Sequence, residues 1–329
     1  MKRVFIVWEK ECIRSENIAQ HFNAEIIHIY PFRSKGSLFK TILRYFISMF
    51  ITLYLLIKKK PKIVFVINLP FPLILTIYLF SRISKIRYIL DTHSGAFTDN
   101  KWKKFMPIYK VISKNALLNI NTCLNHSEQV KNWGGESYII SDVPVMFKNT
   151  INNISLPAKS IFVVCSYNTD EPIETIFEAA KRTPDVNYYF SGNYQLLDYK
   201  YIRNKPGNVT FIGYLPIEEY FSYLKSVRAI LVLTKRDNTM QRGAYEALAL
   251  EQPIITSNFN ILVESFGNAA IYVNNNAIEI AKAVYLIIDN YDSFKTIAGV
   301  QKKLRLKVFE SIRNSIEDRL TREIGQMAS

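Results

Sequence analysis

Apolar and polar positions alternate along the first half of the chain in blocks that predict strands separated by helices. Runs rich in β-branched and aromatic residues, bounded by polar or turn residues, are typical of buried strands. They cover residues 3–8, 25–30, 62–68, 87–93 and 117–124. Segments with apolar residues at helical spacing lie near residues 14–22, 38–58, 72–84, 102–115 and 126–132. This alternation indicates a parallel α/β sheet.

The alternation restarts after a polar, irregular segment at residues 142–158, which we interpret as a linker. Further strands are expected at residues 161–167, 186–192, 209–215, 229–234, 253–257 and 269–274, and helices at 171–183, 216–226, 240–250 and from 277 to the end. We therefore expect an α/β protein of two doubly wound, Rossmann-like domains, residues 1–150 and 151–329, that face a central cleft. Ligands of such sheets bind beyond the carboxyl ends of the strands.

The composition agrees with two packed domains. The chain has 329 residues, of which 49% are hydrophobic, enough to bury two cores. Its cysteines, Cys12, Cys123 and Cys165, are odd in number and lack CxxC spacing, so neither a disulfide framework nor a zinc site is indicated. The first apolar run is too short for a signal peptide. A cytoplasmic protein with reduced thiols is expected.

Positive charge is concentrated in the first half of the chain. The formal net charge is +14, of which residues 1–150 carry +13 and residues 151–329 carry +1. No acidic residue lies between Glu25 and Asp91. Nucleic acid, an anionic membrane or an anionic substrate could bind such a surface. Because no nucleic-acid recognition motif accompanies the charge, nucleic acid is not expected as a partner.

The stretch between Glu25 and Asp91, which lacks acidic residues, is also the most apolar part of the chain. Residues 45–57 form a 13-residue apolar run, which as a helix rises about 20 Å and is too short to span a bilayer alone. A second run, residues 63–80, is interrupted by one asparagine and two prolines. Basic side chains beside an aromatic, apolar face fit a protein that lies on an anionic membrane surface. A buried helix with a solvated basic end and a membrane-spanning hairpin of both runs are the alternatives.

The segment NTMQRGAYEALALEQPIITS, residues 238–257, carries the main candidate binding site. A polar loop precedes a helix that is expected to begin near Thr239 or Met240, where free amides and the positive dipole end offer an anion site. Arg242 and Glu246 lie one turn apart on this helix. The pair fits a phosphate and the vicinal hydroxyls of a ribose. Alternatively it is a surface i,i+4 ion pair worth a few tenths of a kcal/mol.

The residues RGAYEALALEQPIITS resemble the donor-site segment of glycosyltransferases with the GT-B fold, in which a glutamate-bearing helix leads through Ala-Leu-Ala-x-Gly-x-Pro into a strand. The segments PKIVFVINLPFPL, RYILDTHSGAF, SYNTDEPIETIFEAA and NVTFIGYLPIEEYFSYLKSVRAILVLT extend the resemblance over nearly the whole chain. They are similar to bacterial polysaccharide-assembly members of the large retaining, sucrose-synthase-like family (glycosyltransferase family 4-like). The resemblance implies a GT-B fold.

The resemblance also implies a donor site in the second domain. Its residues are Glu246 at the ribose, the amides of Met240, Gln241, Arg242 and Gly243 at the diphosphate, and Gly213 and Tyr214 near the nucleotide base.

Two departures from the family pattern affect this site. Asn238 stands where the family has a glutamate that commonly contacts the donor sugar. The sequence SYNTDEP replaces the arginine and lysine that usually follow the first strand of the domain. The charge of the diphosphate is therefore expected to be neutralised by Lys235, Arg236 and Arg242.

On the acceptor side, Asp91 and His93 follow a strand within YILDTHSGAF. Either could take the proton of the acceptor hydroxyl, and Asp91 could orient His93. Alternatively, Asp91 caps the following turn and His93 is a packed polar residue. In the loop WEKECIRSENIAQ, Arg14 and Ser15 are candidates for a phosphate contact, although Ser15 is equally a helix N-cap with Arg14 in solvent.

These features predict a hexosyltransferase that moves a sugar from a UDP- or GDP-linked donor to a lipid-diphosphate-linked glycan, in the biosynthesis of a capsule or exopolysaccharide. The enzyme would be peripheral on the cytoplasmic face of the cell membrane. Since the histidines are dispersed and no DxD pair is present, neither a metal nor another cofactor is expected. The alternatives are a noncatalytic GT-B-like subunit that recruits a transferase to the membrane, and a nucleotide-sugar epimerase of the same fold.

Overall fold

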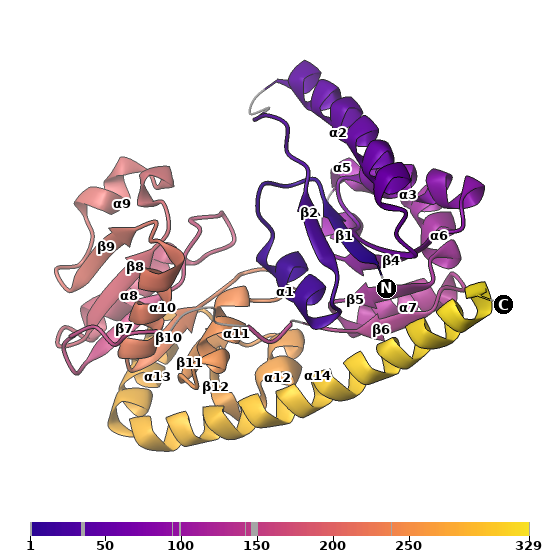
Figure 1. Cartoon of the computed structure of the whole chain (residues 1–329). Helices are drawn as coiled ribbons and strands as arrows, with labels where there is room; N and C mark the ends of the chain where they lie inside the picture. The colour runs from indigo at the N-terminus through magenta and orange to yellow at the C-terminus, as the bar shows by residue number, and fades with distance from the viewer. Residues whose placement is uncertain are drawn as a thin grey trace. The chain divides into compact units, whose positions relative to one another are not determined.

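The protein is described by a computed structural model that places residues 2–33, 37–93, 95–98, 100–141, 143–145, 151–237 and 239–328. The chain folds into two compact units (Figure 1). The first consists of Met1–Val143 and Val308–Ser329, and the second of Pro144–Lys307. Both units are α/β, as the sequence predicts.

A parallel sheet of six strands among the described residues forms the centre of the first unit. The strands are β1 (Arg3–Val7), β2 (Glu25–His28), β3 (Ile63–Ile67), β4 (Arg87–Thr92), β5 (Leu118–Asn121) and β6 (Ser137–Ile139). Their order is β2-β1-β3-β4-β5-β6, and every pair is parallel. The strand order reverses between β1 and β3, so the switch point of this sheet lies at the carboxyl ends of those two strands.

The helices of the first unit cover both faces of this sheet, because every residue of β3 is buried. Before the last helix they are α1 (Ile13–His21), α2 (Leu38–Lys59), α3 (Phe71–Ile83), α4 (Gly95–Thr98), α5 (Asn100–Lys103), α6 (Met106–Asn115) and α7 (Leu124–Asn132). Helix α3 begins directly after Pro70 and holds a second proline in its first turn. Proline fits there because the first amides of a helix have no partner within it.

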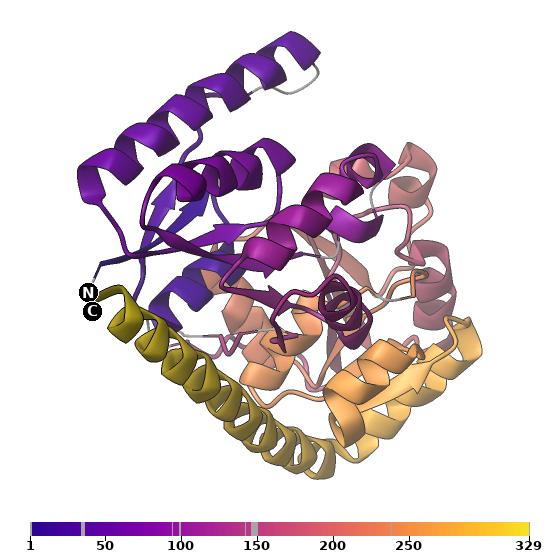
Figure 2. The ribbon, with the colours of Figure 1, turned by 90° about the vertical axis from the view of Figure 1, so that its right-hand side faces the viewer.

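Helix α2 turns large apolar side chains towards solvent instead of towards the core. Its buried residues are Ser48, Thr52 and Leu56, spaced four apart on one face. The Thr52 hydroxyl accepts a 2.9 Å hydrogen bond from the indole N–H of Trp8. Figures 1 and 2 show α2 at the outside of the first unit. Its exposed large apolar residues are Leu38, Phe39, Ile42, Leu43, Phe46, Phe50, Ile51, Tyr54 and Ile57.

The length of α2 changes one expectation from the sequence. Among the described residues, α2 is a helix long and apolar enough to cross a membrane, with 22 residues that rise about 33 Å. The apolar run at 45–57 is therefore the centre of a longer helix, and its shortness does not exclude a span. The alternative of a spanning hairpin is wrong, because residues 63–67 of the second run form the buried strand β3.

The second unit also contains a parallel sheet of six strands among its described residues. They are β7 (Ser160–Val163), β8 (Asn187–Ser191), β9 (Val209–Gly213), β10 (Ala229–Val232), β11 (Ile254–Ser257) and β12 (Ala270–Val273). The order is β12-β11-β10-β7-β8-β9. The switch point of this sheet therefore lies between β7 and β10.

Successive residues of these strands face two separate cores, as the two-residue period of a strand requires. Ile161 and Leu231 pack with α8 (Ile173–Arg182) and α13 (Ala277–Asp289) on one face. Phe162 and Ile230 pack on the other face, which is covered by α10 (Ile217–Ser226), α11 (Arg242–Ala249) and α12 (Asn260–Phe266). Short elements complete the unit: η1 (Tyr194–Leu196), α9 (Tyr199–Arg203) and η2 (Gly267–Ala269).

The last helix, α14 (Tyr291–Ala328), corrects the domain boundary expected from the sequence. The sequence predicts all C-terminal helices in the second domain, whereas Val308–Ser329 belongs to the first unit. Phe309, Ile316 and Leu320 are buried in the first unit's core. Arg3 makes a bidentate ion pair with Glu317 at 2.6 and 2.7 Å. Figure 2 accordingly shows the end of α14 beside the N-terminus.

Candidate functional site

The candidate donor site lies at the switch point of the second sheet, where β7 and β10 end. After β10 the chain runs through a loop and enters α11, which begins at Arg242 with Gln241 as its N-cap. The helix thus starts two to three residues later than the sequence predicts. Its first amides are those of Arg242 and Gly243, whereas the amides of Met240 and Gln241 belong to the preceding loop and cap.

Glu246 is buried in this unit and is held by two side chains. Only 5% of the residue is exposed. Arg242 Nε donates to Oε1 at 2.8 Å, and the Tyr220 hydroxyl donates to Oε2 at 2.6 Å. The i,i+4 ion pair of Arg242 with Glu246 therefore exists. It differs from the surface ion pair that the sequence offers as an alternative, because its carboxylate is buried. Burial raises the pKa of Tyr220 and the neighbouring carboxylate raises it further, so the phenol stays protonated and donates.

The Arg242 side chain pairs with this buried carboxylate and is itself partly exposed to solvent. Its side chain is 48% exposed, compared with 7% for Glu246. A guanidinium carries five N–H donors in a planar fork, and the bond to Glu246 uses the Nε donor. The remaining donors suit a bidentate contact with a phosphate.

Gly243 is the point of close approach between α11 and the chain that follows β7. A Cβ added at Gly243 would lie 2.8 Å from Cγ1 of Val164. Real Cβ contacts are not that short, so packing requires glycine at this position.

Asp170 ties the loop after β10 to the loop after β7. The Thr234 hydroxyl donates to Asp170 Oδ2 at 2.9 Å, and the Lys235 amide donates to the Asp170 carbonyl at 2.7 Å. Arg236 Nε lies 4.0 Å from Asp170 Oδ1, with its side chain 65% exposed. Lys235 is exposed as well. The two cations therefore lie at the edge of the switch point with their charged ends near water.

In the sequence, these cations are followed by four further residues of the predicted donor site: Asn238, Thr239, Met240 and Gln241, the N-cap of α11. Asn238 lies outside the described residues. The Thr239 hydroxyl donates to the carbonyl of Asp237 at 3.3 Å. Met240 packs its side chain against the core beneath α10, α11 and α12, so that side chain serves packing.

The loop after β7 contains an anion of its own. The Glu171 carboxylate accepts hydrogen bonds from the backbone amides of Ser166, Tyr167 and Asn168, the shortest at 2.6 Å. Tyr167 has a φ of 59°, and such a left-handed residue helps successive amides to converge on an anion. Burial raises the pKa of Glu171, and the amide bonds counteract part of that rise. Because the carboxylate fills this nest, a donor phosphate has to be bound elsewhere.

Gly213 and Tyr214 lie at the carboxyl end of β9, an edge strand. Gly213 has a φ of 79°, and Tyr214 is 86% exposed. Two strands separate β9 from β10, so the ends of these strands are about 14 Å apart across the sheet. The structure places both residues on the same edge of the sheet as α11 but does not bring them into contact with Glu246.

The candidate acceptor residues meet at the end of β4 in the first unit. Asp91 is fully buried. Arg14 donates to its Oδ1 through Nε at 3.1 Å and Nη2 at 3.0 Å, and His93 Nε2 lies 3.2 Å from Oδ2. Burial by itself would raise the pKa of Asp91, but Arg14 and His93 outweigh it and lower the pKa. Asp91 is therefore a charged carboxylate that orients the ring of His93.

The backbone of His93 is held on its other side by Asn68. The His93 amide donates to Asn68 Oδ1 at 3.0 Å, and Asn68 Nδ2 donates to the His93 carbonyl at 3.2 Å. The His93 side chain is 30% exposed. This geometry matches the predicted pairing of Asp91 with His93 and differs from the alternative of a turn cap beside a packed histidine.

Arg14 and Ser15 do not offer a phosphate site of the kind we expected. Arg14 also donates to the carbonyls of Ile140 and Ser141, and its side chain is 11% exposed. It neutralises Asp91 instead of lying in solvent. Ser15 is fully buried, its hydroxyl donates to Cys12 Sγ at 3.2 Å, and the N-cap of α1 is Cys12.

Reasoning from the sequence missed Tyr220, Asp170 and Glu171. Tyr220 lies within the quoted segment PIEEYFSYLKS, where only its place on the inner side of an amphipathic helix could have drawn notice. Glu171 lies in the loop that departs from the family pattern. No group of three or more His, Cys, Asp or Glu residues that could hold a metal occurs in the described part of the chain.

Residues 148–302 match the family model described as glycosyl transferases group 1. The matched residues lie within the second unit and include Glu246 and Arg242. No curated protein matches the chain in sequence.

Solved structures resemble the whole chain. HepE from Anabaena, in complex with UDP-glucose, has a TM-score of 0.71 at 12% identity, over 98% of this chain and 99% of HepE. The Escherichia coli structure described as trehalose-6-phosphate bound with UDP-2-fluoro glucose has 0.64 at 9% identity, over 95% and 99%. UDP-GlcNAc 2-epimerase from Methanocaldococcus jannaschii has 0.58 at 16% identity, over 88% and 93%. At these identities the likeness shows the fold: two parallel Rossmann-like sheets of the GT-B type, as predicted.

Proposed function

We propose that this protein is a glycosyltransferase that moves a hexose from a nucleotide-diphosphate sugar to a lipid-linked or growing glycan. The observation that carries the proposal is the buried Glu246, held by Tyr220 and Arg242 at the switch point of the unit that matches the glycosyl transferases group 1 model. A carboxylate with two oxygens can accept hydrogen bonds from both vicinal hydroxyls of a ribose. UDP-linked sugars in HepE and in the E. coli structure favour a UDP-linked donor over a GDP-linked one.

The donor diphosphate is proposed to lie against Arg242 and the first amides of α11. Negative charge develops on the nucleotide phosphate as the bond to the sugar breaks. Fixed donors aimed at that charge, the guanidinium of Arg242 and the amides of Arg242 and Gly243, stabilise it without reorganising. Lys235 and Arg236 supply further positive charge from the neighbouring loop. No metal is required in this scheme.

His93 is proposed to accept the proton of the acceptor hydroxyl. Its Nε2 faces the Asp91 carboxylate, which favours the tautomer with a proton on Nε2 and leaves Nδ1 as the basic nitrogen. Asp91 itself is a poor proton acceptor, because Arg14 and His93 hold its pKa low. Asp91 is thus a positioning residue, and His93 is the proposed base.

The first unit is proposed to bind the cytoplasmic face of the cell membrane through α2. Two of the three buried residues of this helix, Ser48 and Thr52, are small and polar, whereas nine large apolar residues are exposed. A helix that only packs on a soluble core has the opposite distribution. Lys58 in its last turn adds positive charge, which anionic lipids attract, whereas Lys59 pairs with Glu25. A membrane-bound transferase fits a lipid-diphosphate-linked acceptor and a role in cell-surface polysaccharide assembly.

Calorimetric titration with UDP and with GDP tests the donor site. We expect one nucleotide to bind and Glu246→Ala to lose at least tenfold in affinity. Glu178→Ala serves as the matched control, because Glu178 is an exposed carboxylate of the same unit that pairs with Lys181. Unchanged affinity in Glu246→Ala would refute the site. Absence of binding by either nucleotide would favour a noncatalytic membrane-recruiting subunit.

The epimerase alternative is favoured by one observation, the structural likeness to UDP-GlcNAc 2-epimerase. The family match of residues 148–302 favours transfer instead. Incubation of the protein with UDP-GlcNAc, followed by separation of the 2-epimers, distinguishes the two. An epimerised nucleotide sugar would establish the alternative.

A further inference from the structure

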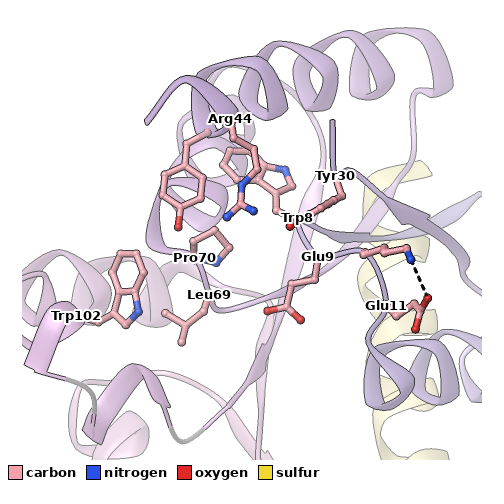
Figure 3. Close-up of a pocket in the computed structure, with 10 residues that line it drawn as sticks. Trp8, Glu9, Glu11, Tyr30, Arg44, Leu69, Pro70 and Trp102 are labelled. Atoms are coloured by element: carbon pink, nitrogen blue, oxygen red, sulfur yellow. Dashed lines mark ion pairs between the residues drawn. The ribbon is translucent and has the colours of Figure 1, made fainter. Parts of the chain in front are cut away.

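A cavity of 520 Å³ opens at the switch point of the first sheet (Figure 3). Residues 8–11, which follow β1, and residues 69–70, which follow β3, line it. Open α/β sheets bind ligands at this place, where neighbouring loops separate to opposite faces. The roles assigned above to His93, Asp91 and Glu246 do not involve this cavity. It is therefore a candidate site whose ligand has not been accounted for.

Four of the ten residues that line this cavity are aromatic; three of them are half-buried and Trp8 is 2% exposed. Trp8, Tyr30, Tyr45 and Trp102 all line it. Trp8 and Tyr45 stack on each other with ring centroids 6.1 Å apart. Such flat, apolar surfaces suit the apolar face of a pyranose ring, while a few polar groups fix its orientation. The cavity thus has the composition of a carbohydrate site.

Arg44 and Glu9 place opposite charges at different parts of the cavity. Lys10 lies 3.8 Å from Glu11, so these two largely neutralise each other. Arg44 enters from α2, and its guanidinium lies over the rings of Tyr30 and Tyr45 at 4.9 and 5.5 Å. The Glu9 carboxylate lies on the side of the strand ends. A phosphate next to Arg44 and sugar hydroxyls next to Glu9 satisfy both charges, whereas a phosphate next to Glu9 would be repelled.

Arg44 and Tyr45 also belong to α2, the helix with the exposed apolar face. Phe46, the next residue, is 56% exposed, and Phe50 one turn later is 64% exposed. The cavity therefore lies beside a surface that suits lipid chains. From α2 to the strand ends, the surface is first apolar, then positively charged at Arg44, and then aromatic with Glu9. A ligand with a lipid tail, a phosphate and a sugar, in that order, matches this arrangement.

We propose that this cavity binds the sugar-phosphate head of an amphiphilic acceptor, with the phosphate at Arg44, the first sugar between the aromatic rings and Glu9, and the lipid along α2. This inference rests on the proposed glycosyltransferase function and names the acceptor subsite, which that proposal leaves open. The ends of β3 and β4 are neighbours in the sheet, so a sugar above β3 extends towards His93.

Tryptophan fluorescence tests the subsite, because two of the three tryptophans line the cavity. The third, Trp133, is replaced in a Trp133→Phe background, so that emission reports on Trp8 and Trp102. The probes are farnesyl diphosphate linked to glucose, to galactose or to N-acetylglucosamine, and farnesyl diphosphate alone. We expect at least one sugar-linked probe to change the emission at a concentration tenfold or more below that needed for farnesyl diphosphate. Arg44→Gln should raise that concentration at least tenfold.

Arg82→Gln is the matched control, since Arg82 is an exposed arginine of α3 that does not line the cavity. Equal binding of farnesyl diphosphate, unchanged emission with all three linked probes, or unchanged affinity in Arg44→Gln would overturn the inference. UDP and GDP are titrated into the same samples. If neither nucleotide binds, the proposed function fails; if one binds while the linked probes do not, only the acceptor subsite fails.

Discussion

The hydroxyl of Tyr220 donates a 2.6 Å hydrogen bond to Oε2 of Glu246, from a helix that lies 26 residues earlier in the chain. Tyr220 also packs edge-on against Phe162 of β7, with ring centroids 5.5 Å apart. The phenol therefore fixes one oxygen of the carboxylate, while Arg242 fixes the other. Glu246 is held in a defined orientation before any ligand binds.

Tyr220→Phe is expected to weaken nucleotide binding about fivefold, because it removes one hydrogen bond worth about 1 kcal/mol from the buried carboxylate. The packing against Phe162 is kept, so the fold should be unaffected. Titration calorimetry measures the affinity. Tyr223→Phe provides the control, since Tyr223 is on the same helix and also packs on Phe162. Equal affinity in both variants would show that Tyr220 does not position Glu246.

The ion pair of Arg14 with Asp91 predicts a pH-dependent stability. Arg14→Gln leaves a fully buried carboxylate without its main counter-charge and should cost about 3 kcal/mol of unfolding free energy at pH 7. In the unaltered protein the folded pKa of Asp91 is lowered. Its stabilising contribution is thus complete above the unfolded pKa of about 4 and is lost as the pH falls through the folded value.

In the Arg14→Gln variant, the contribution of Asp91 to stability changes with pH in the opposite direction, because burial without Arg14 raises the pKa of Asp91. The stability difference between the two proteins should therefore shrink as the pH falls from 7 to 4. Denaturant unfolding at several pH values measures it. In an Asp91→Asn background the effect of Arg14→Gln should be smaller and independent of pH; a constant difference in both backgrounds would contradict the assignment.

Gly243→Ala is expected to destabilise the second unit by about 1 to 3 kcal/mol, because the new Cβ would clash with Val164. Thermal unfolding measures the loss. Val164→Ala in the same chain should restore part of it by removing the atoms that clash. Gly207→Ala is the control, since a Cβ at Gly207 meets no atom within 4 Å. Similar losses at both glycines would rule out the clash.

Replacement of Phe46 and Phe50 by Gln should weaken binding to vesicles that contain phosphatidylglycerol at least tenfold. Burial of a phenylalanine contributes about 2 kcal/mol, and both side chains are more than half exposed, so the fold loses little. Vesicle co-sedimentation measures binding. Val300→Gln with Leu304→Gln is the control pair, because both residues are exposed apolar positions on α14. Equal vesicle binding by all three proteins would remove α2 as the membrane contact.

Most of the elements, and the α/β class of the fold, follow from local patterns in the amino-acid sequence. Strand and helix periods are local, so the pattern of apolar residues located β1 and α2 to within about a residue, as well as the two parallel sheets. It missed β6, a three-residue strand, and the short helices α9 and α12, all of which are too short to show a clear period. The sequence also identifies the segment around Glu246, and the pair Asp91 and His93 two positions apart, because the groups of each site lie close together along the chain.

The contacts that those groups make depend on the fold of the whole chain. Tyr220 reaches Glu246 across 26 residues, and Arg14 reaches Asp91 across 77. Periodicity cannot report such pairs, since strand order in the sheet brings them together. The same reason applies to residues 308–329, which return to the first unit, and to α2. Its apolar pattern predicts a helix, but which face is buried depends on Trp8 and α3, which occupy the side of Thr52 and leave the phenylalanines exposed.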